Sequence, residues 1–283
     1  DYNFSRYNFF LVNYFLHQNM EAKALKIIKN AREKNRTNLL IQETENFLKE
    51  GKSEKIKQFF NCKNPNDSLA EFFYVIANLY ASEKDYRASN FYIKISQFLN
   101  KKFLPNKALL AENYYFQRKY NLSKNTYEKL KSIGAAYSWY SSKSIATIFL
   151  EQKGKDFSIK KLEKDFKFIS EPSFDHYYEM ANFYKDNQYY KKSIKYYSMA
   201  LEKINSKHFL VPKILDRRGT SYERLGDWEN AEKDLLESLR IKPNDPFVMN
   251  YLAYSWIDQG INLDKGLEML IKANSIRKND RYI

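Results

Sequence analysis

The sequence predicts an all-α fold made of stacked pairs of short helices. The main observation is an internal repeat, because similar segments recur every 34 to 38 residues through most of the chain. The composition agrees, since 7 Gly and 6 Pro in 283 residues are fewer than an all-β chain with many tight turns needs. A period of this length is typical of a solenoid in which each unit packs on its neighbours. Six units begin near Ala70, Leu104, Trp139, Phe174, Pro212 and Pro246.

Four positions of the repeat carry the same kind of side chain in successive units. Two helices cross closely where both side chains are small, a large ring fills the space beside the crossing, and an apolar residue contacts the next pair. The small residues of the first helix (position 8) are Ala77, Ala111, Ala146, Ala181, Gly219 and Ala253. Those of the second helix (position 20) are Ser89, Ser123, Ser158, Ser193, Ala231 and Gly266. The rings (position 11) are Tyr80, Tyr114, Phe149, Tyr184, Tyr222 and Trp256, and the apolar residues (position 24) are Ile93, Tyr127, Leu162, Tyr197, Leu235 and Leu270.

Turn residues fall between the predicted helices. Gly226 and Asp227 stand where one helix must end and the next begin, and Pro243 and Pro246 separate two units. The N-terminal part is less regular, with one helix pair expected over residues 5–34 and a second over 37–61. In this second pair Ile56 replaces the small residue, so we expect its two helices to lie further apart.

The unit from Pro212 to Asp245 resembles the tetratricopeptide repeat. The matching residues are Gly219, Tyr222, Gly226, Asp227, Trp228, Ala231 and Pro243, whereas Arg218 stands where the family usually has Leu. The resemblance implies a right-handed superhelical solenoid of tetratricopeptide-like helix pairs whose first helices line a concave face. Residues 250–270 are similar to a variant unit of bacterial envelope proteins. This second resemblance favours a bacterial protein of the periplasm or cell envelope over a cytoplasmic one.

The predicted organisation has two parts. Residues 1–69 hold the degenerate helix pairs, and residues 70–283 hold six units, with the start of a further unit at residue 281. The chain begins without Met, so any signal peptide or upstream segment lies outside it. It ends where another unit would start, so we expect a natural continuation at the C-terminus. The longest apolar run, from Phe9 to Leu16, is too short for a membrane span, which takes about 20 residues.

The sequence carries no recognisable catalytic or cofactor motif. The three histidines, His17, His176 and His208, lie in different units, and the single Cys62 excludes an internal disulfide framework. His176 and Glu179 have a spacing that could seat a metal, but further ligands are missing and a surface pair is the simpler interpretation. We therefore predict a protein that is not an enzyme and needs no cofactor or metal.

The resemblance implies a binding groove for a protein or peptide on the first helices. Asn offers a peptide backbone both a donor and an acceptor, and Tyr offers contact area at low entropic cost. Asn13 falls at a corresponding place in the N-terminal pair. The predicted groove residues are Tyr74, Asn78, Tyr115, Lys143, Tyr178, Asn182, Lys213, Arg217, Arg224, Asn250 and Tyr254.

Some family members hold a peptide C-terminal carboxylate with Lys and Asn residues of consecutive units. Lys143, Lys213 and Arg217 match the cationic positions of that site. Thr147 and Glu179 stand where asparagines are expected, and Glu179 would repel a carboxylate. The sequence therefore argues against this particular mode of binding.

Two alternatives to groove binding stay open, and the first follows from the net charge of +14. Many lysines fall on second helices, which form the convex face, and they could bind nucleic acid or another polyanion. The simpler interpretation is a lysine-rich composition of the kind that an AT-rich genome gives. The other alternative is self-association through the C-terminal end, because terminal repeats need polar caps and this end is apolar.

Overall fold

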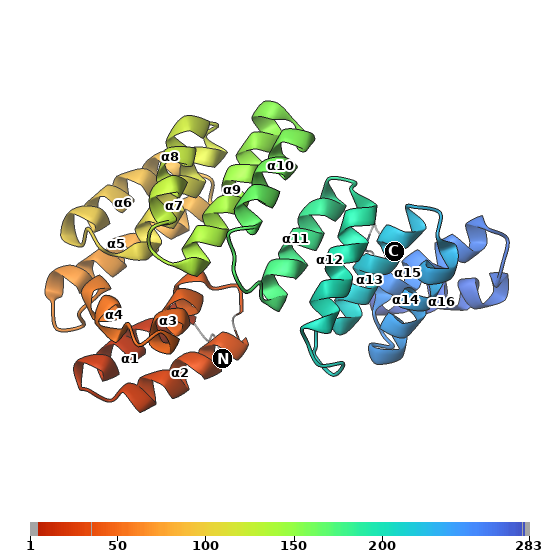
Figure 1. Ribbon diagram of the computed structural model, residues 1–283, viewed down its shortest axis with the longest axis horizontal. Helices are drawn as coiled ribbons and strands as arrows, with labels where there is room; N and C mark the ends of the chain where they lie inside the picture. Colours follow the sequence, from red (N-terminus) through yellow and green to blue (C-terminus); the bar gives the residue numbers. More distant parts are fainter. Residues whose placement is uncertain (1–4, 35, 279, 281–283) are drawn as a thin grey trace. The chain divides into compact units, whose positions relative to one another are not determined.

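The computed structural model describes residues 5–34, 36–278 and 280, and all regular structure in these residues is α-helical (Figure 1). The two helices of each pair pack on each other, and the predicted all-α solenoid of helix pairs is confirmed. The first eight helices are α1 (Ser5–His17), α2 (Glu21–Lys34), α3 (Leu39–Lys49), α4 (Ser53–Phe59), α5 (Pro65–Ser82), α6 (Tyr86–Leu99), α7 (Leu104–Phe116) and α8 (Tyr120–Leu130). The others are α9 (Ala135–Lys153), α10 (Lys155–Phe166), α11 (Phe174–Asp186), α12 (Tyr190–Glu202), α13 (Val211–Glu223), α14 (Trp228–Ile241), α15 (Pro246–Asp258) and α16 (Leu263–Ile276).

The helix pairs follow the predicted units. The two N-terminal pairs are α1 with α2 and α3 with α4, and the six regular units run from the α5/α6 pair to the α15/α16 pair. The further unit predicted from residue 281 lies outside the described residues.

The turn inside each pair contains a residue in the left-handed region of the backbone map. Glycine takes this place in four of the turns, for example Gly51 with φ of 67° and Gly226 with φ of 78°. Asn19, Lys84, Arg118 and Gln188 take it in the other four turns, at a cost of about 1 kcal/mol each because their Cβ crowds the next carbonyl. The same tight turn thus recurs with different sequences, which explains why glycine alone does not mark the units.

Small residues meet where the two helices of a pair cross. The position 8 residues are all buried, and so are the position 20 residues. The Ser123 hydroxyl donates to the Ala111 carbonyl at 2.8 Å, and the Ser158 hydroxyl donates in the same way to Ala146. A side chain at Gly219 would place its Cβ 3.1 Å from the Ala231 carbonyl oxygen, so this crossing is tight and favours the smallest residue. The predicted role of these two positions is confirmed.

Two of the predicted core positions are less buried in the first or the last of the regular units. At position 24 the side chain is buried in the first five units, whereas Leu270 in α16 is only half-buried. At position 11 Tyr80 in α5 is exposed, although Tyr184 and Trp256 are buried. Tyr80 stacks on the Tyr92 ring of α6, with ring centres 5.4 Å apart.

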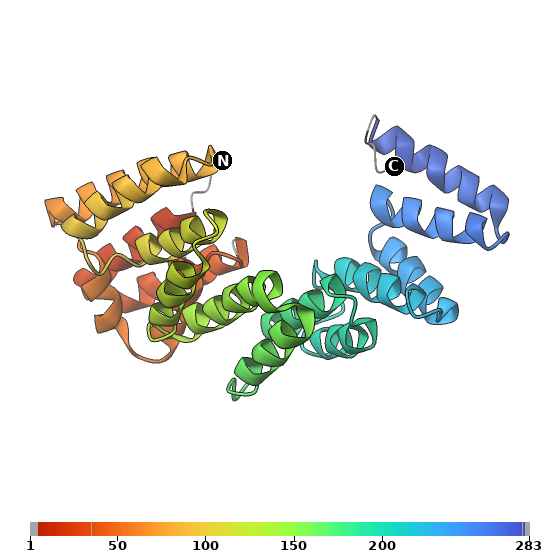
Figure 2. The same cartoon turned by 90° about the horizontal axis from the view of Figure 1, so that it is seen from above.

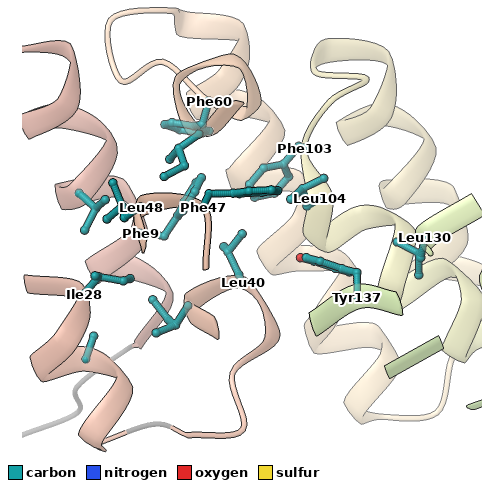
Figure 3. Close-up of a cluster of buried hydrophobic side chains, with 14 of the residues drawn as sticks. Phe9, Ile28, Leu40, Phe47, Leu48, Phe60, Phe103, Leu104, Leu130 and Tyr137 are labelled. Carbon is teal, nitrogen blue, oxygen red and sulfur yellow. The ribbon is translucent and has the colours of Figure 1, made fainter. Parts of the chain in front are cut away.

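The chain divides after Phe168 into two compact units, called unit 1 (residues 1–168) and unit 2 (169–283). The predicted division after residue 69 marks a change in repeat regularity and does not separate compact units. The reason is that α1–α4 share one core with α5–α9: Phe9, Phe60, Phe103 and Tyr137 belong to the same buried cluster (Figure 3).

A buried glutamate joins α3 to α9 in unit 1. Glu43 Oε2 accepts hydrogen bonds from the backbone N–H groups of Ala136 at 2.7 Å and Tyr137 at 3.3 Å, in the first turn of α9. These N–H groups have no partner within their own helix, and the positive end of the helix dipole favours a carboxylate. A Cβ at Gly134 would lie 1.8 Å from Glu43 Oε1, so glycine makes room for this contact.

Unit 2 stacks three helix pairs from α11 to α16 (Figure 2). Its most buried ion pair joins Arg218 on α13 to Asp234 on α14, with Nε to Oδ2 at 2.7 Å and Nη2 to Oδ1 at 2.8 Å. Arg218 also donates to the Ser198 hydroxyl on α12 at 2.9 Å. Arg218 is the residue that departs from the usual Leu, and the paired carboxylate explains how a cation is accommodated there.

Candidate functional site

The predicted groove residues lie on the first helices of their pairs, in two sets. The unit 1 set comprises Tyr74 and Asn78 on α5, Tyr115 on α7 and Lys143 on α9. The unit 2 set comprises Tyr178 and Asn182 on α11, Lys213 and Arg217 on α13, Arg224 directly after α13, and Asn250 and Tyr254 on α15. Each set is a candidate site of its own unit.

In unit 1 the N-terminal helices cover Tyr74. The Arg6 guanidinium of α1 lies 5.0 Å from the centre of the Tyr74 ring, and the Phe103 ring meets it edge-on at 5.6 Å. Burial raises the pKa of the Tyr74 hydroxyl to about 12. Tyr74 is therefore part of the unit 1 core, which differs from its predicted place in an open groove.

Asn13 differs from its prediction in the same way. Its side chain is buried, and Nδ2 donates to the Ile56 carbonyl of α4 at 3.0 Å. This bond joins α1 to α4 and so stabilises the N-terminal helices against each other. The pattern that placed Asn13 in a groove assumed that these helices continue the regular stacking.

The other unit 1 residues have varied surroundings. Asn78 is exposed, whereas Tyr115 is half-buried beside Tyr120, with ring centres 5.9 Å apart. Lys143 is half-buried, and its Nζ lies 6.0 Å from the centre of the Trp139 ring. In the unit 1 set, Asn78 is therefore fully accessible to a partner, whereas Tyr115 and Lys143 are only partly accessible.

In unit 2 a polar network joins three side chains on adjacent helices. Asn182 Oδ1 accepts from Arg217 Nη1 at 2.6 Å and from the Tyr197 hydroxyl at 2.8 Å. Burial raises the pKa of the Tyr197 hydroxyl, so the phenol stays protonated and acts as a donor. The predicted double role of Asn182 is therefore revised, because its Oδ1 acceptor is already engaged inside the protein.

The remaining unit 2 residues combine exposed and paired groups. Lys213 and Tyr254 are exposed, and Tyr178 is half-buried beside Phe174. Arg224 is exposed and its Nε lies 3.5 Å from Glu223 Oε2, which also accepts from the Tyr251 hydroxyl at 2.7 Å. The face therefore presents cations, a phenol ring and amide groups.

One residue of this face was missed by sequence reasoning. Asp216 lies between Lys213 and Arg217 in α13, and burial together with nearby Asp245 raises the pKa of its carboxyl to about 6. The cations Arg217, Lys185 and Lys213 partly oppose this shift. The signal that could have revealed Asp216 is its place at repeat position 5, which it shares with Tyr74, Lys143, Tyr178 and Asn250.

Nothing in the described part of the chain forms a metal site. No group of three His, Cys, Asp or Glu side chains gathers there with the geometry to hold a metal ion. His176 instead caps α11, where its Nδ1 accepts from the Ser173 backbone N–H at 3.1 Å. The contact of His176 is thus a helix cap, which accounts for this residue without a metal.

A family model described as "Tetratricopeptide repeat" matches residues 212–245, which comprise most of α13, all of α14 and the turn that follows. The chain therefore contains a tetratricopeptide repeat. Its matched unit is the one that the sequence indicated most clearly, with Gly219 and Ala231 at the helix crossing.

A solved structure of low sequence identity shares the fold of this chain. A chain of the APC/C hetero-tetramer Cut9-Hcn1 is 13% identical with a TM-score of 0.54, and the match covers 93% of this chain and 51% of that chain. The C-terminal part of a TPR repeat-containing protein from Cytophaga hutchinsonii is 15% identical with a TM-score of 0.49, and the match covers 72% and 78%. This chain thus spans about half the length of the Cut9-Hcn1 chain. No curated protein sequence matches it.

The tetratricopeptide repeat fold is that of a protein–protein interaction scaffold, and proteins of this kind are typically not catalysts. No described helix is both long and apolar enough to cross a bilayer. The bacterial origin and the envelope location stay predictions from the sequence.

Proposed function

We propose that this tetratricopeptide repeat protein binds an extended peptide segment of a partner protein along the first helices of unit 2. The candidate face runs over α11, α13 and α15. Its binding residues are Tyr178, Asn182, Lys213, Arg217, Arg224, Asn250 and Tyr254. The binding requires shape and hydrogen bonding and no chemical step.

The observation that carries this proposal is the network around Asn182. Arg217 and Tyr197 both donate to its Oδ1, which fixes the orientation of the amide and directs Nδ2 away from these donors. A fixed amide donor suits the carbonyl groups of an extended peptide, because little side-chain entropy is lost on binding. Asn182 is therefore the residue on which we expect binding to depend most.

Exposed groups on the two neighbouring helices extend the face. The exposed ammonium group of Lys213 can pair with peptide carbonyls or carboxylates, and the exposed Tyr254 ring offers area with few rotatable bonds. Asp216 lies between the cations of α13 and limits the preference for an acidic peptide. A peptide of mixed charge fits this face best.

Site-specific photo-crosslinking tests the proposal. A photoreactive phenylalanine derivative at Tyr254 is expected to capture a partner from an extract of the source organism. The same group at Lys195, an exposed residue of the second helix α12, is the matched control and should capture less. Equal capture at both positions, or capture at Lys195 alone, would contradict the proposed face.

A second function is favoured by the exposed lysines of the second helices. Lys160, Lys164 and Lys167 on or directly after α10 are exposed, and so are Lys191, Lys192 and Lys195 on α12. Each of these two sets, the first in unit 1 and the second in unit 2, could bind a polyanion with strong salt dependence. A titration with heparin in rising salt tests it, and the absence of binding at physiological salt would remove this function.

A further inference from the structure

The second half of every regular unit exposes the same two repeat positions to solvent. Positions 22 and 29 are seven residues apart, so they lie on one side of the second helix. Both are exposed in all six regular units, because the repeat places no other helix over them. In five units they hold polar or charged residues: Asn125 and Ser132, Lys160 and Lys167, Lys195 and Glu202, Lys233 and Arg240, and, after one inserted residue, Glu268 and Ser275.

The exception is the first regular unit, where both positions of α6 are phenylalanines. Phe91 at position 22 is 58% exposed, and Phe98 at position 29 is 81% exposed. The core of unit 1 does not use either ring, since the buried side of α6 consists of Ser89, Ile93 and Ser96. Folding therefore gives no reason for two large apolar side chains at positions that are polar in the other units.

The Phe91 ring belongs to a wider aromatic surface on the α5/α6 pair. It contacts the Tyr92 ring with centres 5.3 Å apart, and Tyr92 stacks on Phe73 of α5 at 6.3 Å. Phe73 in turn contacts Phe72, which is 57% exposed. Figure 2 shows this helix pair at an edge of unit 1. Contiguous exposed apolar surface of this kind marks an interaction site.

Positive charge surrounds the two phenylalanines of α6. Four exposed cations lie within about one helical turn of Phe91 or Phe98 in the sequence. They are Arg87, Lys94, Lys101 and Lys102. Residues 86–111 contain no Asp or Glu, and the carboxylate before them, Asp85, accepts from the Ala88 backbone N–H as the cap of α6. This part of the surface is therefore both apolar and cationic.

We propose that these six side chains, called the α6 face, bind the surface of an anionic lipid bilayer. The Phe91 and Phe98 rings would enter the boundary between headgroups and acyl chains, which removes their apolar area from water. The four cations would remain among the headgroups, where the negative potential of the leaflet attracts them. Interfacial helices combine the same two features, basic residues and large apolar side chains.

A bilayer fits the α6 face better than a nucleic acid does. Proteins hold single strands in a groove that follows the backbone, whereas the α6 face lies on the outside of its helix pair. The two rings are about 10 Å apart along the helix axis, so a flat surface can reach both at once. The neighbouring Leu79 of α5 is 60% exposed, and its aliphatic side chain suits lipid but cannot stack on a base.

Sedimentation with lipid vesicles tests the proposal on the wild-type chain. Vesicles of equimolar phosphatidylcholine and phosphatidylglycerol should bind it, and vesicles of phosphatidylcholine alone should bind it much less. Phe91→Ser combined with Phe98→Ser should weaken binding at least about tenfold and leave the fold intact, because other units hold polar residues there. Phe209→Ser changes a ring of unit 2 that is 66% exposed, and this control should stay within about twofold of wild type.

The charge of the α6 face is tested separately. Lys94→Gln combined with Lys101→Gln and Lys102→Gln should also weaken binding to the anionic vesicles, and the binding that remains should depend less on salt. Lys191→Gln combined with Lys195→Gln on α12 is the matched control and should bind as wild type does. Loss of vesicle binding in the α12 variant alone would show that the polyanion surface is responsible and would overturn the proposal.

A tryptophan in place of Phe98 shows whether the ring enters the bilayer. Brominated acyl chains quench tryptophan fluorescence at short range, so Phe98→Trp should be quenched more than wild type by brominated anionic vesicles. Lys160→Trp, at repeat position 22 on α10, is the matched control and should not be. Absence of binding to anionic vesicles, or unchanged binding without Phe91 and Phe98, would overturn the proposal. Tighter binding to a single-stranded oligonucleotide that is lost in the double phenylalanine variant would overturn it as well.

Discussion

The Glu43 carboxylate accepts a 2.7 Å hydrogen bond from the backbone N–H of Ala136, although 93 residues separate the two in the sequence. The contact joins the irregular N-terminal helices to the regular repeats of unit 1. The helices α1–α4 belong to the core of unit 1, and Phe72 and Leu79 of α5 stay exposed.

Glu43→Ala is expected to destabilise unit 1. Without the carboxylate, the N–H groups of Ala136 and Tyr137 stay buried and lose their partner, at about 1–3 kcal/mol each. Hydrogen exchange should therefore become faster in the first turn of α9. Glu54→Ala removes an exposed carboxylate of α4 and is the matched control. Unchanged protection of α9 in Glu43→Ala would show that the contact contributes nothing.

Gly134→Ala tests the same contact from the other side. The added methyl would meet Glu43 Oε1 at 1.8 Å, so the carboxylate must leave its place, at a cost of roughly 2–4 kcal/mol in the free energy of unfolding. In a Glu43→Ala background the methyl meets no carboxylate, and the substitution should cost much less. A double-mutant cycle from urea unfolding measures this coupling. Additive effects would contradict a direct clash.

Asp234→Ala is expected to destabilise unit 2 by about 3–5 kcal/mol, because it leaves the Arg218 guanidinium buried without its carboxylate. The double variant Arg218→Leu with Asp234→Leu should recover most of this loss, since it restores the usual family residue at position 218. Chemical unfolding of the wild type, of Asp234→Ala and of the double variant measures the order of their free energies of unfolding. Removal of the exposed Glu237 partner of Arg240 should change nothing measurable. A double variant as unstable as Asp234→Ala would contradict the account.

Asp216→Asn should stabilise unit 2 above pH 6 and have little effect at pH 4. The pKa of the Asp216 carboxyl is raised to about 6 in the folded chain from 3.8, so folding is favoured by protonation and the wild type loses stability as pH rises from about 4 to about 6. The shift corresponds to about 2–3 kcal/mol at neutral pH. Unfolding of wild type and variant at pH 4 and pH 7.5 gives the difference. A difference that does not change with pH would contradict this assignment.

The regular repeats could be predicted from the sequence because they rest on local spacing. Gly219 and Ala231 are both small because α13 and α14 cross closely between them. The same close crossing recurs in every regular unit. The same register located Asn182, Lys213 and Arg217 on successive first helices. Periodicity is a nearest-neighbour property, so it predicts nearest-neighbour contacts well.

The contacts that break the period could not be predicted in this way. Glu43 looked like an ordinary charged residue of a short helix, and only its place on the buried stripe with Leu40 and Phe47 could have signalled a partner. Tyr74 and Asn13 were placed in a groove on the assumption that the N-terminal helices stack before α5. The bond from Arg217 to Asn182 also lay beyond sequence reasoning, because it depends on side-chain reach between two units.

The central claim is that α11, α13 and α15 of unit 2 form the peptide-binding face, and a peptide selected from a random library on the wild-type chain tests it most directly. Its dissociation constant is measured with wild type, with Asn182→Ala combined with Lys213→Ala, and with Lys191→Ala combined with Lys195→Ala on the second helix α12. Loss of two polar contacts should weaken binding by at least about tenfold in the first variant, while the second stays within about twofold of wild type. Equal affinity of the first variant and wild type, or loss confined to the α12 variant, would contradict the claim.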